Sequence, residues 1–162
     1  MKVVAFSDPH GYLPKLKDFP ECDVVCIAGD ICPLDVQRDL VESISWFLLE
    51  FKPWAESLPC KKVIFVGGNH DDKKCCREYA RLGITVLGCL EYKGFFCTHV
   101  PIHPGQLEFC RGNIHGHIHK QRKNGEVLEQ LEGRYYNVNC EFNNYTPVLF
   151  DDIVKYFNEI GY

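Results

Sequence analysis

Three common features are missing from this sequence of 162 residues: a Cys-x-x-Cys pair, a long apolar run and an excess of basic residues. No apolar run approaches the length of a membrane span, and the run at residues 3–6 is too short for the core of a signal peptide. The formal net charge is −4. The broad positive surface on which sequence-independent nucleic-acid binding depends is therefore not expected.

The ten cysteines are scattered along the chain, and their spacing follows no pattern. Disulfide scaffolds are typical of shorter secreted chains. We therefore interpret these side chains as reduced thiols that serve as small apolar residues. Reduced thiols and the absence of a signal peptide together predict a cytoplasmic protein.

Composition and the order of predicted elements indicate one α/β domain over residues 1–162. Apolar residues make up 46% of the chain and charged residues 25%, as in ordinary globular proteins with a sizeable core. Asn124-Gly125 predicts a hairpin turn. Strands are expected at residues 2–7, 23–28, 62–66, 84–87, 92–98, 112–115, 135–139 and 148–150. A βαβ-like first half and a strand-rich second half suit two sheets packed face to face with helices outside.

Apolar residues at helical spacing, together with capping residues, predict three helices. The first is expected over residues 35–51, with its first residue as the N-cap, and Pro53 interrupts it. The second follows Asp71 or Asp72 and runs to about residue 81. The third follows Asp151 as its N-cap.

All seven histidines lie in or beside five short polar segments, and four of these segments follow strand-like runs. In an open α/β sheet, ligands bind at the carboxyl ends of the strands. The segments are Asp8-Pro9-His10, Gly29-Asp30, Gly68-Asn69-His70-Asp71, Thr98-His99 and His115-Gly116-His117-Ile118-His119. They offer oxygen and imidazole donors but no thiolate, which is the ligand set of a two-metal hydrolytic centre.

Spacing and glycine content favour the same interpretation. Asp8 and His10 are two residues apart, so a continued extended backbone would place both side chains on one side. Gly29 allows the backbone to approach closely beside Asp30. Each segment alone is a weak signal, because Gly-Asp pairs and capping aspartates are common in turns. Five such segments with the same chemistry indicate one centre.

In this order the segments resemble the motifs of the calcineurin-like metallophosphoesterase superfamily, which read D-x-H, G-D, G-N-H-[DE], H and G-H-x-H. The match runs from Asp8 to His119 and no ligand position is missing. Residues 136–139 and 144–148 resemble the end of small phage and bacterial members. The resemblance implies a four-layer αββα sandwich, an α/β fold in which helices flank two mixed β-sheets and the metals lie at one edge of both.

The resemblance also implies two divalent metal ions, with Mn²⁺ as the first candidate and Fe, Zn²⁺ or Ni²⁺ as alternatives. His70 would not bind metal; it would face the substrate and donate a proton to the leaving oxygen. The first ion would be held by Asp8, His10 and His119, the second by Asn69, His99 and His117, and Asp30 would bridge both.

Three functions are compatible with such a centre. The leading prediction is a binuclear phosphoesterase that hydrolyses a small phosphodiester or phosphomonoester by attack of a metal-bridging hydroxide. A metal-dependent nuclease is less favoured, because the chain is short, its net charge is −4 and a DNA-binding domain is not evident. A catalytically weak interaction scaffold is disfavoured, since scaffold members have degraded ligand sets. No membrane partner is expected, and the sequence does not indicate an oligomeric state.

The sequence departs from the protein-phosphatase branch of the superfamily in two ways. It lacks the Arg that helps to hold phosphate in that branch, so phosphoserine or phosphothreonine protein is not the expected substrate. Asp35 is displaced from the position that would support His70, which leaves the residue that orients His70 open. Asp71 and Asp72 are candidates, although capping of the following helix is the favoured reading of both.

Several neighbours of the five segments allow two interpretations. His103 either contacts substrate phosphate or belongs to a surface loop. His115 is expected to be a buried or supporting histidine rather than a further ligand. Arg111, Lys120 and Arg122 flank the last segment and either bind phosphate or are solvated, and solvated charges are the commoner case.

Overall fold

The computed structural model describes residues 1–120, 122–123, 126–127 and 131–162. Its larger sheet has the strand order β11-β1-β2-β3-β4, and within it β11 runs antiparallel to its neighbour. These strands are β1 (Val3–Phe6), β2 (Cys22–Ile27), β3 (Cys60–Val66), β4 (Thr85–Leu87) and β11 (Val148–Leu149).

The smaller sheet has the order β10-β7-β6-β5, with one antiparallel pair, β5 and β6. Its strands are β5 (Leu90–Tyr92), β6 (Phe95–Cys97), β7 (Gly112–His115) and β10 (Tyr135–Asn137). A separate short ribbon pairs β8 (Arg122–Lys123) with β9 (Glu126–Val127). The predicted turn at Asn124-Gly125 lies between these two strands but outside the described residues.

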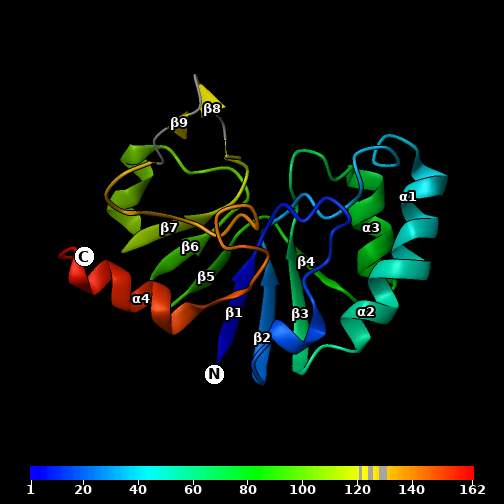
Figure 1. Cartoon of the computed structure of the whole chain (residues 1–162), viewed down its shortest axis with the longest axis horizontal. Coiled ribbons are helices and arrows are strands. Elements are labelled where there is room, and N and C mark those ends of the chain that lie inside the picture. Colours follow the sequence, from blue (N-terminus) through cyan, green and yellow to red (C-terminus); the bar gives the residue numbers. More distant parts are fainter. Residues whose placement is uncertain (121, 124–125, 128–130) are drawn as a thin grey trace.

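Helices flank the pair of sheets, as Figure 1 shows, with α1 to α3 on one side and α4 on the other. The helical segments are α1 (Leu40–Trp46), the π-helical η2 (Phe47–Phe51), α2 (Lys52–Glu56), α3 (Lys73–Arg81) and α4 (Phe150–Glu159). Two 3₁₀ turns are η1 (Leu16–Asp18) and η3 (Pro104–Phe109). The predicted four-layer αββα sandwich, an α/β fold with two mixed sheets, is confirmed.

The two faces of β1 show how the strands are buried. Val4 and Phe6 belong to the apolar cluster beneath α1, η2, α2 and α3, whereas Val3 and Ala5 belong to the cluster between the sheets. None of these four side chains is more than 3% exposed. A strand that is covered on both faces needs apolar residues at every position, which explains the uninterrupted run in the sequence.

The first predicted helix was misplaced at both ends. It begins at Leu40, because the side chain of Asp39 accepts hydrogen bonds from two backbone N–H groups of the first turn and is the N-cap. It also continues past Pro53 to Glu56. The wider turns of η2 precede Pro53, which lies in the first turn of α2, where its missing N–H group is tolerated.

The predicted apolar face of this helix was also partly wrong. The helical spacing of Val36, Leu40, Val41, Ile44, Phe47 and Leu48 predicts a buried face that includes Val41, but Val41 is 75% exposed. The buried side chains are Ser43, Phe47, Phe51 and Ala55, which recur every four residues. Aromatic packing fixes this face, since the ring of Phe47 stacks on that of Tyr79 from α3 with centroids 4.0 Å apart.

Two further predictions required correction. The strand expected over residues 92–98 is a hairpin, in which Lys93 and Gly94 form the turn with φ of 53° and 79°. A two-residue hairpin turn of this kind needs positive φ at both positions, and Lys is not a usual residue there. Phe150 begins α4 instead of ending a strand, so Asp151 lies in the first helical turn and is not the N-cap.

All ten cysteines lie in described residues and are free thiols, as predicted. Cys26 and Cys97 meet between the sheets with their Sγ atoms 3.5 Å apart. Within the described residues, no helix combines the length and the apolar character that a bilayer crossing requires.

Candidate metal centre

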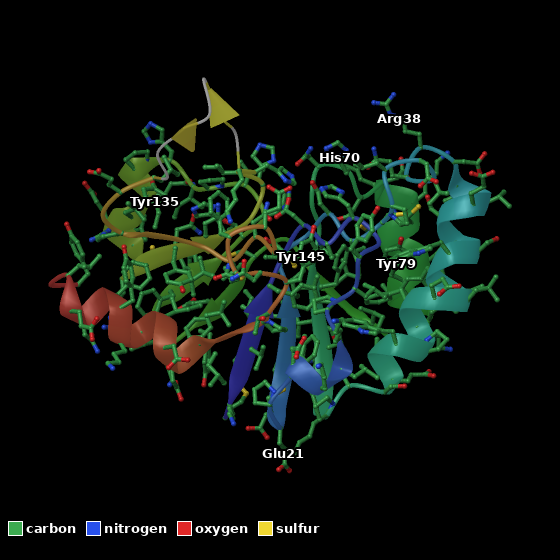
Figure 2. The ribbon with its side chains drawn as sticks, in the orientation of Figure 1. Glu21, Arg38, His70, Tyr79, Tyr135 and Tyr145 are labelled. Atoms are coloured by element: carbon green, nitrogen blue, oxygen red, sulfur yellow. The ribbon has the colours of Figure 1, made fainter. Side chains whose placement is uncertain are left out.

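The polar segments converge at one end of the molecule. Strands β1 and β2 point toward this end in Figure 1, and His70 lies there in Figure 2. The loops that follow β1, β2 and β3 supply one part of the centre, and the loops that follow β6 and β7 supply the rest. Parallel strands from two sheets therefore bring together side chains that are distant in sequence.

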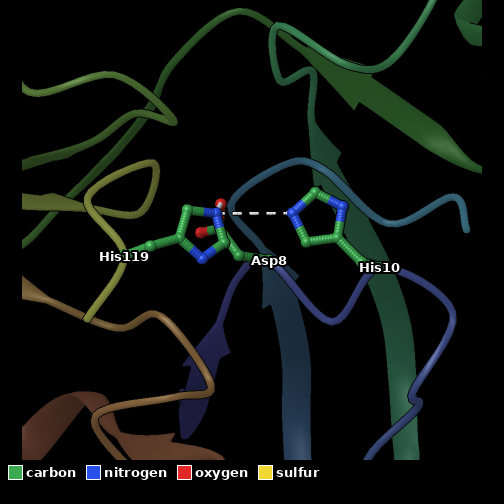
Figure 3. A group of neighbouring side chains, drawn as sticks. All are labelled: Asp8, His10 and His119. Carbon is green, nitrogen blue, oxygen red and sulfur yellow. Dashed lines mark hydrogen bonds and ion pairs between the residues drawn. The ribbon is translucent and has the colours of Figure 1, made fainter. Parts of the chain in front are cut away.

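The first cluster contains Asp8, His10 and His119, which Figure 3 shows facing one another. The Nε2 atoms of the two histidines are 3.4 Å apart, and Asp8 Oδ1 is also 3.4 Å from Nε2 of His119. This separation suits two ligand atoms that each lie about 2.0–2.2 Å from a common ion. All three residues were predicted to hold the first metal.

The second cluster contains Asp30, His99 and His117. Asn69 joins it, because its Oδ1 is 2.8 Å from Nε2 of His99 and 2.8 Å from Nδ1 of His117. Asp30 Oδ2 is 3.2 Å from His99 Nε2. The residues predicted for the second metal are thus brought together with the predicted bridging aspartate.

Buried oxygen atoms that accept no hydrogen bond within the described residues indicate that these clusters fit cations. Asp8 and Asp30 are each 1% exposed. Within the described residues, Asp8 Oδ1 and Asp30 Oδ2 accept no hydrogen bond. A buried carboxylate oxygen that accepts no hydrogen bond is costly, and a metal ion satisfies it. Carboxylate, amide and imidazole donors suit the divalent ions that were predicted.

Four of the candidate ligands have left-handed backbone conformations. The φ angles are 55° at Asp8, 43° at His10, 54° at Asp30 and 64° at His117. Such conformations cost about 1–3 kcal/mol each outside glycine and persist where the surroundings impose them. Backbone hydrogen bonds between the loops, including Asp8 N–H to Gly29 O at 3.0 Å, impose them here. The extended geometry assumed for Asp8 and His10 was therefore wrong, although their side chains do converge.

Two glycines let the loops approach closely. A Cβ atom on Gly29, whose φ is +88°, would lie 2.5 Å from Nδ1 of His99. A Cβ atom on Gly68 would collide with the side chain of Asp30. The predicted close approach beside Asp30 is confirmed. The segment Gly29-Asp30 packs closely against the segments that contain Gly68 and His99.

Carboxylates within the clusters raise the pKa values of His119 and His99. Asp8, with a further contribution from Glu141, raises the pKa of His119 to about 9 against the opposing effect of burial. Burial pushes the pKa of His99 down, but its contacts with Asp30 outweigh burial and leave the pKa raised. The carboxylates thus attract positive charge to both clusters. Metal ions would displace these protons, because imidazole binds metal in its neutral form.

His70 lies at the rim of the centre and not in either cluster. Its side chain is 39% exposed, and its Nε2 is 4.0 Å from Oδ2 of Asp30. Its ring meets the ring of His10 edge to face, with centroids 5.6 Å apart. Its backbone N–H donates to Oδ1 of Asp30 at 2.8 Å. Among described residues, no carboxylate hydrogen-bonds its imidazole, so Asp30 and His10 are what position it.

Asp71 has a role that the sequence did not reveal. Its carboxylate accepts hydrogen bonds from the backbone N–H groups of Asp30, Gly68 and Ile31 at 2.7, 2.8 and 3.3 Å. Burial raises its pKa to about 6, although these donors oppose the shift. Asp71 thereby joins the loop that contains Asp30 to the loop that contains Gly68. The predicted helix cap is Asp72, whose Oδ1 accepts from Lys74 N–H at 2.7 Å.

The flanking residues mostly serve the fold. Nδ1 of the exposed His103 accepts a hydrogen bond from the N–H of Gly105 and caps η3. His115 is buried, its Nδ1 is 2.8 Å from the carbonyl oxygen of Gly116, and burial lowers its pKa to about 4. Arg111 donates to Asn158 Oδ1 near the C-terminus. The side chain of Arg122 lies outside the described residues.

An αββα sandwich with two Asp/His clusters at one edge defines a class of α/β proteins that hold divalent metal ions. The chain belongs to the calcineurin-like phosphoesterase family, whose match covers residues 1–160. Members of this family bind divalent metals and are generally phosphoesterases. Among curated proteins, none matches the chain.

Solved structures that are similar to this chain include three with 15–21% sequence identity. A protein of unknown function from Aquifex aeolicus, AQ665, is 21% identical with a TM-score of 0.60, over 95% of this chain and 98% of that one. The Pseudomonas putida nuclease MPE is 21% identical with a TM-score of 0.49, over 72% and 60%. A Vps29 mutant from Entamoeba histolytica is 15% identical with a TM-score of 0.41, over 87% and 76%. The first of these supports the fold.

Proposed function

We propose that this protein is a binuclear metal-dependent phosphoesterase. Asp8, His10 and His119 would hold one ion, Asn69, His99 and His117 the other, and Asp30 would bridge both. The observation that carries the proposal is a pair of buried carboxylates, each with an oxygen that accepts no hydrogen bond within the described residues. Each of these oxygens faces an imidazole nitrogen, at 3.4 and 3.2 Å. Mn²⁺ is the first metal to test.

When bound, two divalent ions would supply a hydroxide nucleophile near neutral pH and polarise the phosphoryl oxygens. The side chains of the protein would position the proton donor and protonate the leaving oxygen. Asp30 holds the N–H of His70 and so fixes the start of the loop that presents its ring. His70, exposed at the rim, donates a proton to the leaving oxygen. His10 packs edge to face against this ring and restricts its orientation.

A phosphodiester is the favoured substrate, with a phosphomonoester as the alternative. A cavity of about 420 Å³ adjoins His10. The described residues that line it include no Lys or Arg; besides His10 they are Gly11, Tyr12, Pro33, Leu34 and Asp35. A monoester dianion would benefit from an additional cation beside the metals, whereas a diester carries a single charge.

Free thiols throughout the chain fit the predicted cytoplasmic location.

The binuclear proposal predicts two metal ions per chain. Metal-free protein saturated with Mn²⁺ should contain two equivalents by elemental analysis after desalting, because each cluster offers its own set of donors. Removal of the metal with a chelator should abolish hydrolysis, and Mn²⁺ should restore it. A protein that retains at most one equivalent at saturation would contradict two-metal binding.

The substrate proposal predicts that diesters are cleaved at least as well as monoesters. Purified protein loaded separately with Mn²⁺, Zn²⁺, Fe²⁺ or Ni²⁺ should be assayed on nitrophenyl phosphate, bis-nitrophenyl phosphate and 2′,3′- and 3′,5′-cyclic nucleotides. The kcat/KM values of the best diester and the best monoester decide the order. Single-stranded DNA in the same panel tests the nuclease alternative. Turnover of nitrophenyl phosphate with every diester inert would overturn the preference.

A further inference from the structure

We propose that Glu141 is a positioning residue that sets the orientation and the metal affinity of His119, an inference that rests on the proposed function. Glu141 Oε1 lies 2.9 Å from Nδ1 of His119. That nitrogen is on the far side of the ring from Nε2, which faces Asp8 and His10. None of the five motif segments includes Glu141, which follows His119 by 22 residues.

Glu141 is itself held in place through both its carboxylate and its backbone. Its second oxygen, Oε2, accepts the backbone N–H of Lys120 at 2.8 Å. Its own backbone N–H donates to Oδ1 of Asn139 at 2.9 Å. Asn139 is fully buried, and the next residue, Cys140, donates its N–H to the carbonyl of Ser7. Glu141 is therefore anchored to the end of β1, directly beside Asp8.

This contact selects one form of the imidazole. A carboxylate only accepts hydrogen bonds, so Nδ1 of His119 carries the proton and donates it to Glu141. When a metal displaces the proton on Nε2, that nitrogen directs its lone pair toward Asp8 and His10, which is the form that a metal requires. A carboxylate behind a ligating imidazole also increases the basicity of the ring, and removal of such a partner typically lowers metal affinity 10–100-fold.

The second cluster lacks this device within the described residues. Nδ1 of His99 lies 2.8 Å from the carbonyl oxygen of Ala28, a neutral acceptor. Nδ1 of His117 faces Asn69 and so points into its own cluster, and within the described residues its Nε2 makes no hydrogen bond. In the first cluster, Nδ1 of His10 is buried and makes no hydrogen bond within the described residues. Among the described residues, a negatively charged acceptor therefore lies behind His119 but behind none of the other three candidate histidine ligands. Glu141 should strengthen the first metal site and leave the second unchanged.

The test is a Mn²⁺ titration of the metal-free protein by calorimetry, with Glu141→Gln as the variant. Glutamine keeps the size of the side chain but removes the charge that holds the proton on Nδ1. We expect the affinity of one ion to fall roughly 10–100-fold and that of the other to stay unchanged. Glu159→Gln, which makes the same change of charge at an exposed site on α4, should affect neither ion.

A second readout separates positioning from a structural role. In Zn²⁺-loaded protein with ¹⁵N-labelled histidine, NMR should show a proton on Nδ1 of His119 that exchanges slowly in the wild type and rapidly in Glu141→Gln. Thermal unfolding of both metal-free proteins should differ little. If the variant does not fold, the wild-type spectrum still decides, because a His119 with its proton on Nε2 or with a freely exchanging Nδ1 proton contradicts the proposal.

The outcomes distinguish this inference from the proposed function. If the wild type binds two ions and Glu141→Gln binds both with the wild-type affinities, the role of Glu141 is overturned and the binuclear centre stays intact. A wild type that binds one ion, with an affinity that falls in Glu141→Gln, would contradict the binuclear centre and support Glu141. A wild type that binds no ion would overturn both.

Discussion

Replacement of His70 by alanine is expected to lower kcat roughly 10²–10⁴-fold, the usual contribution of general acid catalysis, while both metal ions stay bound. His70 lies outside both clusters and its ring is partly exposed, which suits a proton donor better than a ligand. By contrast, Asn69→Ala should weaken the second metal, because its Oδ1 lies between His99 and His117. Elemental analysis together with kcat distinguishes these two neighbours.

The loss in His70→Ala should depend on the leaving group. Nitrophenolate needs little protonation as it departs, whereas an alkyl or ribose oxygen needs a proton, so alkyl and ribose esters should suffer more. His103→Ala is a matched control, because that histidine is exposed and caps η3 away from the clusters. Equal losses with both kinds of leaving group, or loss of a metal ion in His70→Ala, would show that His70 is not the proton donor.

Replacement of Asp30 by asparagine should be the most damaging single change, since it weakens both metal sites at once. Asn has nearly the same shape as Asp but carries no charge. Asp30 is 1% exposed, and its Oδ2 lies 3.2 Å from Nε2 of His99. The affinity of both ions should fall by more than the roughly 100-fold that loss of a supporting partner costs. Activity should fall further than in Asn69→Ala, which removes a ligand of one ion.

Elemental analysis and Mn²⁺ titration of Asp30→Asn provide the measurement. Asp39→Asn is the matched control: it is the same substitution at the N-cap of α1, where Asp and Asn are about equally good. If Asp30→Asn bound one ion with unchanged affinity and lost only the other, Asp30 would be a terminal ligand and the bridging role would be wrong.

The layers of the fold and the location of the centre could be predicted from the sequence because they depend on local patterns. Strands covered on both faces, such as β1, produce uninterrupted apolar runs, and polar motifs at their ends reveal where ligands gather. The seven predicted ligands do lie together, while their individual roles stay predictions. The single-domain organisation also stays a prediction.

Features that depend on contacts between distant segments could not be predicted. The first helix was misplaced because local spacing cannot show that η2 widens before Pro53 or that Phe47 stacks on Tyr79. Asp71 resembled a helix cap, and only the folded chain shows that it joins two loops. Glu141 belongs to no recognised pattern, because its partner is 22 residues away.

The centre joins segments that lie 109 residues apart in the sequence, which has a consequence for synthesis on the ribosome. Asp8 Oδ2 accepts the N–H of His117, 109 residues later, and β1 pairs with β11 near the C-terminus. Chain segments emerge in order and N-terminal parts collapse first. Asp8 and His10 therefore lack their partners until His117 and His119 have emerged. Metal binding at the first cluster therefore requires His119 to have emerged, and nascent chains that end before this residue should not bind that ion.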